Sequence, residues 1–431
     1  MNAASAVMLF VCAAAPVASA VSDTRLAIAE QVKALDRKAG QIDEQLPRST
    51  VYARTEQVDG DTIVYRAWFN GVGDLLKAIS ERSGPSGVER TEFTPSGLEI
   101  WHDGLLTVTR KEVPTADGGK QVDEARRYYG GLRVPSRWGG TEFDNGVLLR
   151  EVKKTAHFRP GEALDTAKVR EVKIDYPKTP QFTETDEDQA RQRKVLSEPR
   201  DIALDLQKTT PPEVDPHATV TGDSERFRLI HGSASPDGRF AFAVGFEQAP
   251  DWSKYRDRDY KDEETYTVPD QPEELRNYIV EIATRRILGA TAGKYPGSRS
   301  RYNLHEFSTF WSDDSSTFVV RDSEKWHYVS CYAGRIAPGP KLLGVVDLGA
   351  AAEKHAMKFP KARRHAQEAS INIGIEDVQP DGTVRLELYG QQASGPEKGE
   401  IYFTIKETLR LRETPAGLEL SLVSARPVAS K

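Results

Sequence analysis

The sequence predicts a mainly β protein of the α+β class, and three observations support this prediction. Between residues 49 and 154, apolar and polar residues alternate with a period of two, and Gly, Pro and Asp interrupt the alternation at short intervals. A second series of short β-type runs extends through residues 223–431. Only residues 21–46 and a segment near 350–370 have helical patterns. We therefore expect an N-terminal antiparallel β-meander domain and a C-terminal domain of antiparallel sheets.

The chain begins with twenty uncharged residues, which have the pattern of a signal peptide. An apolar run, Ala6–Ala15, is followed by Pro16 and by the small residues Ala18-Ser19-Ala20. The run is shorter than the roughly 20 residues that span a bilayer. We predict cleavage near Ala20 and a periplasmic or extracellular location. A retained anchor is the alternative, because no Lys or Arg precedes the run.

The cysteine content bears on how the chain is stabilised, and the net charge bears on its possible partners. Cys12 lies in the apolar run, where the bulky Phe10 and Val11 disfavour lipid attachment, so Cys331 is the one cysteine expected after cleavage. A chain of this length buries enough surface to fold without disulfides. The net charge of −6 argues against nucleic acid as a partner. We expect no transmembrane segment, metal or cofactor.

The N-terminal elements follow from periodicity and turn chemistry. Residues 21–46 predict an amphipathic helix, capped by Ser22-Asp23 and ending near Gly40, with an apolar stripe formed by Leu26, Ala29, Val32 and Leu35. The 49–154 domain contains predicted strands at 62–69, 74–82, 88–94, 98–102 and 105–112. Turns such as Asp103-Gly104 separate these strands. This domain resembles the repetitive β-meanders of secreted bacterial proteins.

Residues 155–222 are rich in proline and charge, which is typical of an inter-domain linker. A short strand at Val169–Ile174 is the exception. The alternative is an irregular arm that packs across both domains.

The third region, residues 223–431, contains a turn sequence followed by an apolar strand. The turn is Ser235-Pro236-Asp237-Gly238-Arg239-Phe240, and the strand is Ala241–Phe246. A weaker copy runs from Phe310 to Ser316 before the strand 317–320. Over residues 229–349 this pattern resembles TolB/WD40-type β-propeller blades. Ser235 and Ser312 lie 77 positions apart, whereas blades recur every 40–45 residues. We therefore expect propeller-like sheets in an open arrangement and not a full closed propeller.

The C-terminal end of this region predicts a helix near 350–370, interrupted by Pro360, and then two hairpins. The first joins 371–379 to 384–389 through Pro380-Asp381-Gly382, and the second joins 401–411 to 418–423.

Known catalytic motifs are missing from the sequence, and the isolated candidates favour structural roles. Nucleophile-elbow, zinc-protease, Walker and dinucleotide motifs are all absent. The acidic run Asp257, Asp259 and Asp262 lacks the spacing of a calcium loop. Four other candidates are interpreted as sheet or turn residues, namely His231, His305, His327 and Cys331. The basic side chains near 350–370 are interpreted as the solvated side of a helix.

The strongest binding candidate is the long insertion at residues 247–276. Loops longer than about 12–15 residues are often functional or disordered. This insertion carries Trp252, Tyr255, Tyr260 and Tyr266 among charged residues. Rigid aromatic groups suit sugar stacking or protein contact. The alternative is a polar loop whose aromatic rings pack against the sheet.

The sequence thus predicts an exported, non-enzymatic protein that binds a protein or glycan of the cell envelope. An exported hydrolase is the main alternative, because His231, His305 or His327 could meet a distant carboxylate. A structural role in an envelope assembly, docked through the N-terminal helix, is the third possibility.

Overall fold

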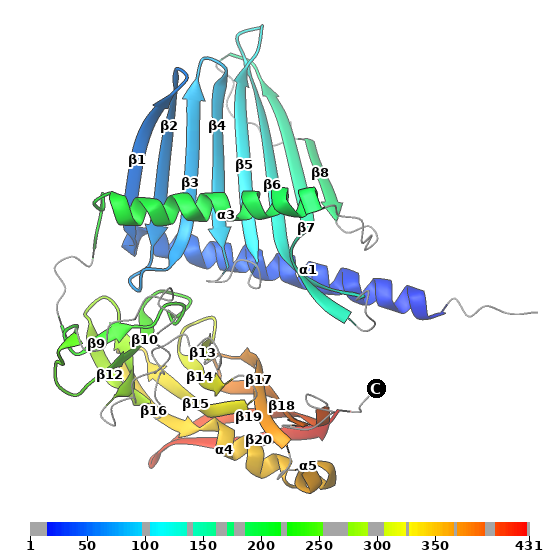
Figure 1. Ribbon diagram of the computed structural model, residues 1–431, viewed down its shortest axis with the longest axis vertical. Helices are drawn as coiled ribbons and strands as arrows, with labels where there is room; N and C mark the ends of the chain where they lie inside the picture. Colours follow the sequence, from blue (N-terminus) through cyan, green and yellow to red (C-terminus); the bar gives the residue numbers. More distant parts are fainter. Residues whose placement is uncertain are drawn as a thin grey trace, which may run out of the picture. The chain divides into compact units, whose positions relative to one another are not determined.

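The computed structural model describes residues 15–96, 104–135, 141–160, 170–175, 186–216, 222–252, 275–291, 306–324, 327–365, 369–392 and 401–428. The chain divides into two compact units. The first comprises Met1–Asp43, Val51–Trp68 and Leu75–Glu213, and the second comprises Glu44–Thr50, Phe69–Asp74 and Val214–Lys431. The strands form four antiparallel sheets, which confirms the mainly β prediction (Figure 1).

The first unit is built on one eight-stranded sheet whose strands lie in chain order, as a meander predicts. Its strands are β1 (Thr50–Val58), β2 (Asp61–Phe69), β3 (Leu75–Gly84), β4 (Gly87–Pro95), β5 (Leu105–Pro114), β6 (Lys120–Pro135), β7 (Thr141–Phe158) and β8 (Arg170–Asp175). The predicted strand 98–102 lies outside the described residues.

Helix α1 (Ala15–Gln45) packs on one face of this sheet. Its buried side chains Ile28, Val32 and Leu35 contact a cluster on the strands, formed by Leu106, Tyr128, Leu149 and Val152. The predicted stripe is thus partly wrong, because the real spacing mixes three and four residues and leaves Ala29 exposed. The helix also continues past Gly40, which lies on an open side of the helix.

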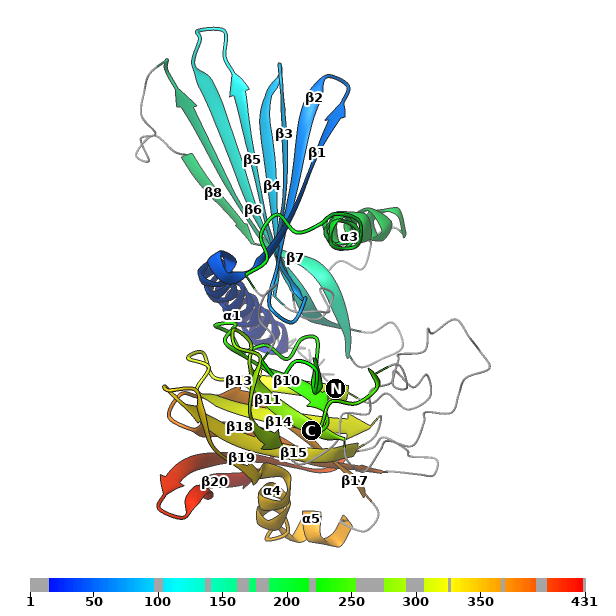
Figure 2. The same ribbon diagram turned by 90° about the vertical axis from the view of Figure 1, so that its left-hand side faces the viewer.

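The opposite face of the sheet is covered by α3 (Asp186–Thr209), which contacts β3 and β7 (Figure 2). Ala203 and Leu206 of this helix are buried. Residues 155–222, which we expected as a linker or an arm, therefore contain the end of β7, the strand β8 and a long helix. The strand β8 lies close to the predicted strand Val169–Ile174, whereas the sequence did not predict α3.

The second unit contains three four-stranded sheets, each a meander in chain order. The first sheet comprises β9 (Phe227–Leu229), β10 (Phe240–Gly245), β11 (Arg276–Glu281) and β12 (Arg286–Thr291). The second comprises β13 (Glu306–Trp311), β14 (Thr317–Glu324), β15 (His327–Ala337) and β16 (Lys341–Asp347). The third comprises β17 (Ala369–Val378), β18 (Thr383–Gln392), β19 (Ile401–Thr414) and β20 (Gly417–Pro427). The described strands close neither a barrel nor a propeller, as expected.

Each of these sheets uses the same turn to enter its second strand. In the first sheet, Ser235 Oγ accepts from Phe240 N at 3.0 Å, and Asp237 Oδ1 accepts from Arg239 N at 3.0 Å. In the second sheet, Ser312 Oγ accepts from Thr317 N at 2.9 Å, and Asp314 Oδ1 accepts from Ser316 N at 3.0 Å.

The third sheet has a shorter version of this turn, in which Asp381 Oδ1 accepts from Thr383 N at 2.9 Å. The residue after the aspartate has a positive φ in all three turns, namely Gly238, Ser315 and Gly382. The first two copies agree with the repeat predicted from the sequence, whereas the third was expected only as a hairpin turn.

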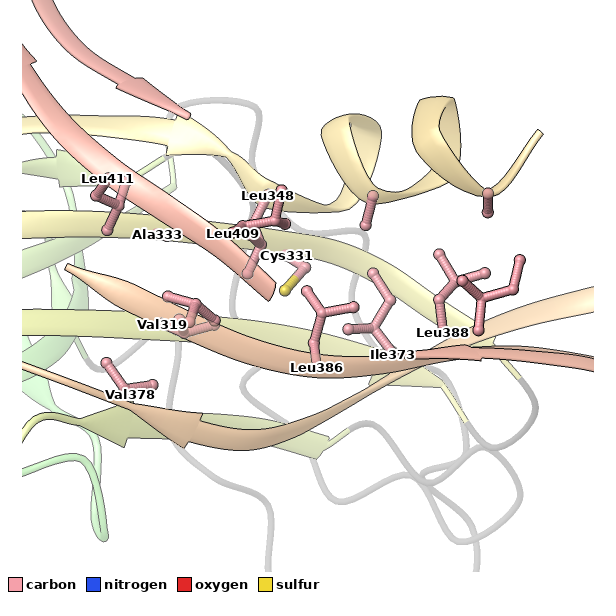
Figure 3. Packing of buried hydrophobic residues seen from close by; sticks show 14 of the residues in the cluster. Val319, Cys331, Ala333, Leu348, Ile373, Val378, Leu386, Leu388, Leu409 and Leu411 are labelled. Atoms are coloured by element: carbon pink, nitrogen blue, oxygen red, sulfur yellow. The ribbon is translucent and has the colours of Figure 1, made fainter. Parts of the chain in front are cut away.

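Apolar layers join the three sheets face to face. Phe240, Phe242 and Ile279 of the first sheet pack against Phe318 and Val320 of the second. A larger cluster joins the second sheet to the third, and Leu348 at the start of α4 (Leu348–Ala356) belongs to it (Figure 3). The predicted helix near 350–370 is thus two helices, α4 and the short α5 (Pro360–His365).

Candidate functional site

Trp252 is the one predicted aromatic residue of the 247–276 insertion that the structure describes. Its indole Nε1 donates to Glu225 O at 2.8 Å. The Arg228 guanidinium lies 4.2 Å from the Trp252 ring, and Phe246 packs edge-on with a centroid distance of 5.8 Å. Trp252 is therefore fixed next to the edge strand β9. Outside the described residues lie Tyr255, Tyr260, Tyr266 and the acidic run 257–262.

Two of the isolated histidine and cysteine candidates have defined surroundings. His231 Nδ1 lies 3.0 Å from Asp74 Oδ1, and Asp74 Oδ2 accepts from Gly232 N at 3.0 Å. Cys331 is buried in β15, and burial raises the pKa of its thiol to about 12, so it is not a nucleophile near neutral pH. His327 begins the same strand, as predicted, while His305 lies outside the described residues.

The basic side chains of α4 and α5 point mostly to solvent. Exposed in the structure are Lys354, Lys358, Lys361, Arg363 and Arg364. This agrees with the interpretation of a solvated helix side.

A hollow on the eight-stranded sheet of the first unit brings charged side chains from four strands to one surface. Its volume is about 420 Å³, and strands β3 to β6 line it with Glu81, Val88, Arg90, Glu92, Val108, Arg110, Glu112 and Glu124. In the strand register, Arg90 lies opposite Arg110, Val88 opposite Glu112, and Val108 opposite Glu92. Cross-strand neighbours share a face of a sheet, so β4 and β5 bring three pairs to this one surface.

The two arginines of the hollow are held by the same local arrangement. Arg90 Nε donates to Glu92 Oε1 at 3.0 Å, and Arg110 Nε donates to Glu112 Oε1 at 3.0 Å. In each case the glutamate follows its arginine by two residues on the same strand face. The pairs hold both guanidinium groups on this face even though Arg90 and Arg110 carry like charges.

Two lysines complete the pairing of the carboxylates. Lys77 Nζ lies 2.7 Å from Glu92 Oε2 and 3.0 Å from Asp43 Oδ1 on α1. Burial disfavours the charge of Lys77, but the hydrogen bonds to Glu92 and Asp43 outweigh it and raise the pKa of Lys77. Lys120 Nζ donates to Glu112 Oε2 at 2.8 Å, and this bond lowers the pKa of Glu112.

Glu124 differs from the other carboxylates of the hollow. It lies opposite Arg110 on β6, yet it forms no ion pair within 4 Å in the part of the chain that the structure describes. Glu124 is therefore an acceptor available to a ligand. Serine, cysteine and histidine are absent from the described lining of the hollow. Guanidinium and carboxylate groups that share one surface can donate and accept hydrogen bonds to a polar ligand.

This hollow was not predicted from the sequence. Its charged residues come from four strands, and only the strand register brings them together. The signal that was available is the repeated Arg-x-Glu pattern at 90–92 and 110–112 in neighbouring strands.

Within the described residues, no three His, Cys, Asp or Glu side chains come close enough to hold a metal ion. No helix among the same residues has the length and apolar character needed to cross a membrane.

Comparisons with known proteins give no family assignment. No protein-family model matches the chain, and no curated protein matches it. A crystal structure of lipopolysaccharide binding protein aligns with 93% of this chain and 82% of its own chain, with 9% identity and a TM-score of 0.11. A TM-score this low supports no inference about fold or ligand.

Proposed function

We propose that this chain is an exported, non-enzymatic binding protein of the cell envelope whose ligand site is the hollow on β3 to β6. Export is supported by the signal-peptide pattern of the first twenty residues. The observation that carries the binding proposal is the pair of ordered arginine–glutamate groups, which line the hollow together with two valines, with Glu124 left available. Ordered polar groups lower the entropic cost of binding.

A neutral glycan fits this site better than a charged ligand. Four glutamates and two arginines line the hollow, and Lys77 and Lys120 pair with two of the glutamates, so most of its charges are already paired. Planar guanidinium and carboxylate groups offer paired donors and acceptors to neighbouring hydroxyls. The volume of 420 Å³ lies within the range of about 300–1,000 Å³ typical of small-ligand pockets.

The test is binding of the purified chain to an array of short neutral oligosaccharides, followed by calorimetry with the best binder. Arg110→Gln and Glu124→Gln should each weaken binding by about tenfold or more, because hydrogen bonds to charged groups contribute about 1.5–3 kcal/mol. Lys111→Gln is the matched control, because Lys111 is exposed on the other face of β5. Equal losses in all three variants, or no glycan binding, would refute the proposal.

The hydrolase alternative retains one supporting observation, the contact between His231 and Asp74, in which the histidine side chain is 66% exposed. Asp–His pairs orient general bases in hydrolases. Hydrolysis of ester or glycoside substrates that disappears in His231→Ala would favour this alternative, whereas unchanged hydrolysis would remove it.

A further inference from the structure

Strand β19 places a carboxyl group where its pattern calls for an apolar side chain. Phe403, Ile405, Leu409 and Leu411 alternate along the buried face of β19 and belong to the cluster between the second and third sheets. Glu407 occupies the middle position of this row, and its side chain is 0% exposed. Its register neighbours, Leu386 on β18 and Ala425 on β20, are apolar.

The group that faces Glu407 is His355 of α4. His355 Nδ1 lies 3.4 Å from Glu407 Oε2, and the imidazole is 17% exposed. Neither carboxyl oxygen of Glu407 nor Nδ1 of His355 makes a hydrogen bond in the described structure. A buried charge without a partner is costly, so the two groups must balance each other.

Both groups favour their neutral forms. Burial raises the pKa of Glu407 to about 7, with Lys358 acting weakly in the opposite direction. Burial lowers the pKa of His355, and Lys358 and Lys354 lower it further. One proton between Oε2 and Nδ1 therefore leaves the pair without net charge, whichever atom carries it.

Other titratable groups on α4, on α5 and on two of the strands that contact α4 have surroundings of their own. On β18, Glu387 pairs with Lys406, and Arg385 pairs with Asp377. On α4 itself Glu353 accepts from the Tyr328 hydroxyl of β15. Cys331 on β15 keeps its proton, since burial raises its pKa to about 12. On α5, Arg363 and Arg364 are exposed, and His365 stacks on Tyr402. The helix α4 has only nine residues, so it depends on packing for its stability.

We propose that Glu407 and His355 form a buried binding site for one proton, and that this proton holds α4 on the third sheet. When the proton is lost, an anion remains in the apolar cluster, and the opening of α4, which hydrates this anion, becomes more favourable. The site is independent of the hollow in the first unit, so either proposal can fail without the other.

Hydrogen exchange of residues 348–356, corrected for intrinsic rates, tests the proposal. When α4 is open, Glu407 and His355 are hydrated, and the pair loses its last proton near the ordinary histidine pKa of 6.5. When α4 is closed on the sheet, the pair loses this proton near 7, the raised pKa of Glu407. Protection of α4 should therefore fall about threefold as the pH rises from roughly 6 to 8. In Glu407→Gln only His355 titrates, and its lowered pKa makes protection rise or stay constant over that range.

Glu387→Gln is the matched control, because Glu387 lies on β18 and pairs with Lys406 on the other face of the third sheet. This variant should keep the wild-type fall in protection. A second, direct measurement is the infrared band of a protonated carboxyl group near pH 6, which Glu407→Gln should remove. If Glu407→Gln does not fold, Glu407→Met serves for both measurements. Protection of wild-type α4 that does not fall, or a band that persists in the variant, would overturn the proposal.

Discussion

The packing of Phe318 against Gly334 gives a quantitative test of how the first and second sheets are joined. Phe318 is fully buried on β14, and its ring meets Phe242 and Trp311, each with a centroid distance of 5.4 Å. Gly334 lies directly opposite on β15. A Cβ at residue 334 would lie 2.3 Å from Phe318 Cζ and 2.8 Å from Gly344 O. The glycine therefore leaves the space that the ring fills.

Three variants separate the ring clash from the backbone clash. Gly334→Ala overpacks the layer and should lower the free energy of unfolding by about 1–3 kcal/mol. Phe318→Ala should cost about 3–5 kcal/mol, because it removes a buried ring from two aromatic contacts. In the double variant, the added methyl group no longer meets the ring. We therefore expect the costs to be non-additive by about 1–2 kcal/mol.

The measurement is urea unfolding, monitored through hydrogen exchange of the amides in β14 and β15. A local probe is needed because a chain with two units need not unfold in one transition. Gly374→Ala is the control, since the nearest atom to an added Cβ there lies 3.8 Å away. If Gly334→Ala costs as much in the Phe318→Ala background as in the wild type, the ring is not the obstacle and the reasoning fails.

Three further predictions concern other parts of the chain. In a Cys12→Ser background, Cys331 should resist thiol reagents in the native state and react fully in urea, because it is buried with a raised pKa; rapid native labelling would contradict this burial. On α1, Leu35→Ala should lower the free energy of unfolding by about 2–5 kcal/mol, whereas the exposed Ala29→Ser should change it little, as urea titration will show. Lys77→Met should destabilise the first unit by about 1–3 kcal/mol at neutral pH, because Glu92 loses a buried partner. The folded pKa of Glu92 lies below its ordinary value of 4.5. The stabilisation from ionised Glu92 is therefore present above pH 4.5 and is lost as the pH falls toward the folded pKa. Lys77→Met should flatten this part of the plot of unfolding free energy against pH.

The sequence predicted those elements whose signals are local. Period-two alternation and turns rich in Gly and Asp located β2 to β5 of the large sheet and both C-terminal hairpins, whereas β1, β6 and β7 were not predicted as individual strands. The helix α3 was missed because Pro199 and a dense run of charges resemble a linker, while its buried residues Ala203 and Leu206 come late in the helix. The third copy of the Asp-Gly turn was missed because it begins with Gln379, where the other copies have serine.

The candidate sites depend on contacts that are distant in sequence, and they were harder to predict. Strand register brings Arg90 next to Arg110, and a sequence pattern does not specify register by itself. Glu407, in contrast, left a visible signal, because it interrupts an otherwise apolar alternation from Phe403 to Leu411. Its partner His355 lies 52 residues earlier and was considered only as part of a basic helix side.

The two faces of the third sheet differ in composition, because one face is apolar and the other carries ion pairs. Lys406 pairs on this face with Glu376 and Glu387, and Arg385 pairs with Asp377. A further sheet would have to bury these charges, and the desolvation penalty of buried ion pairs can exceed their attraction. Repeat proteins end their stacks with a polar face for the same reason. The same strands present Leu386 and Leu388 of β18, with Ile405 of β19, to the second sheet on their other side. The charged face of the third sheet is therefore a poor surface for the packing of a further sheet, since only its other face is apolar.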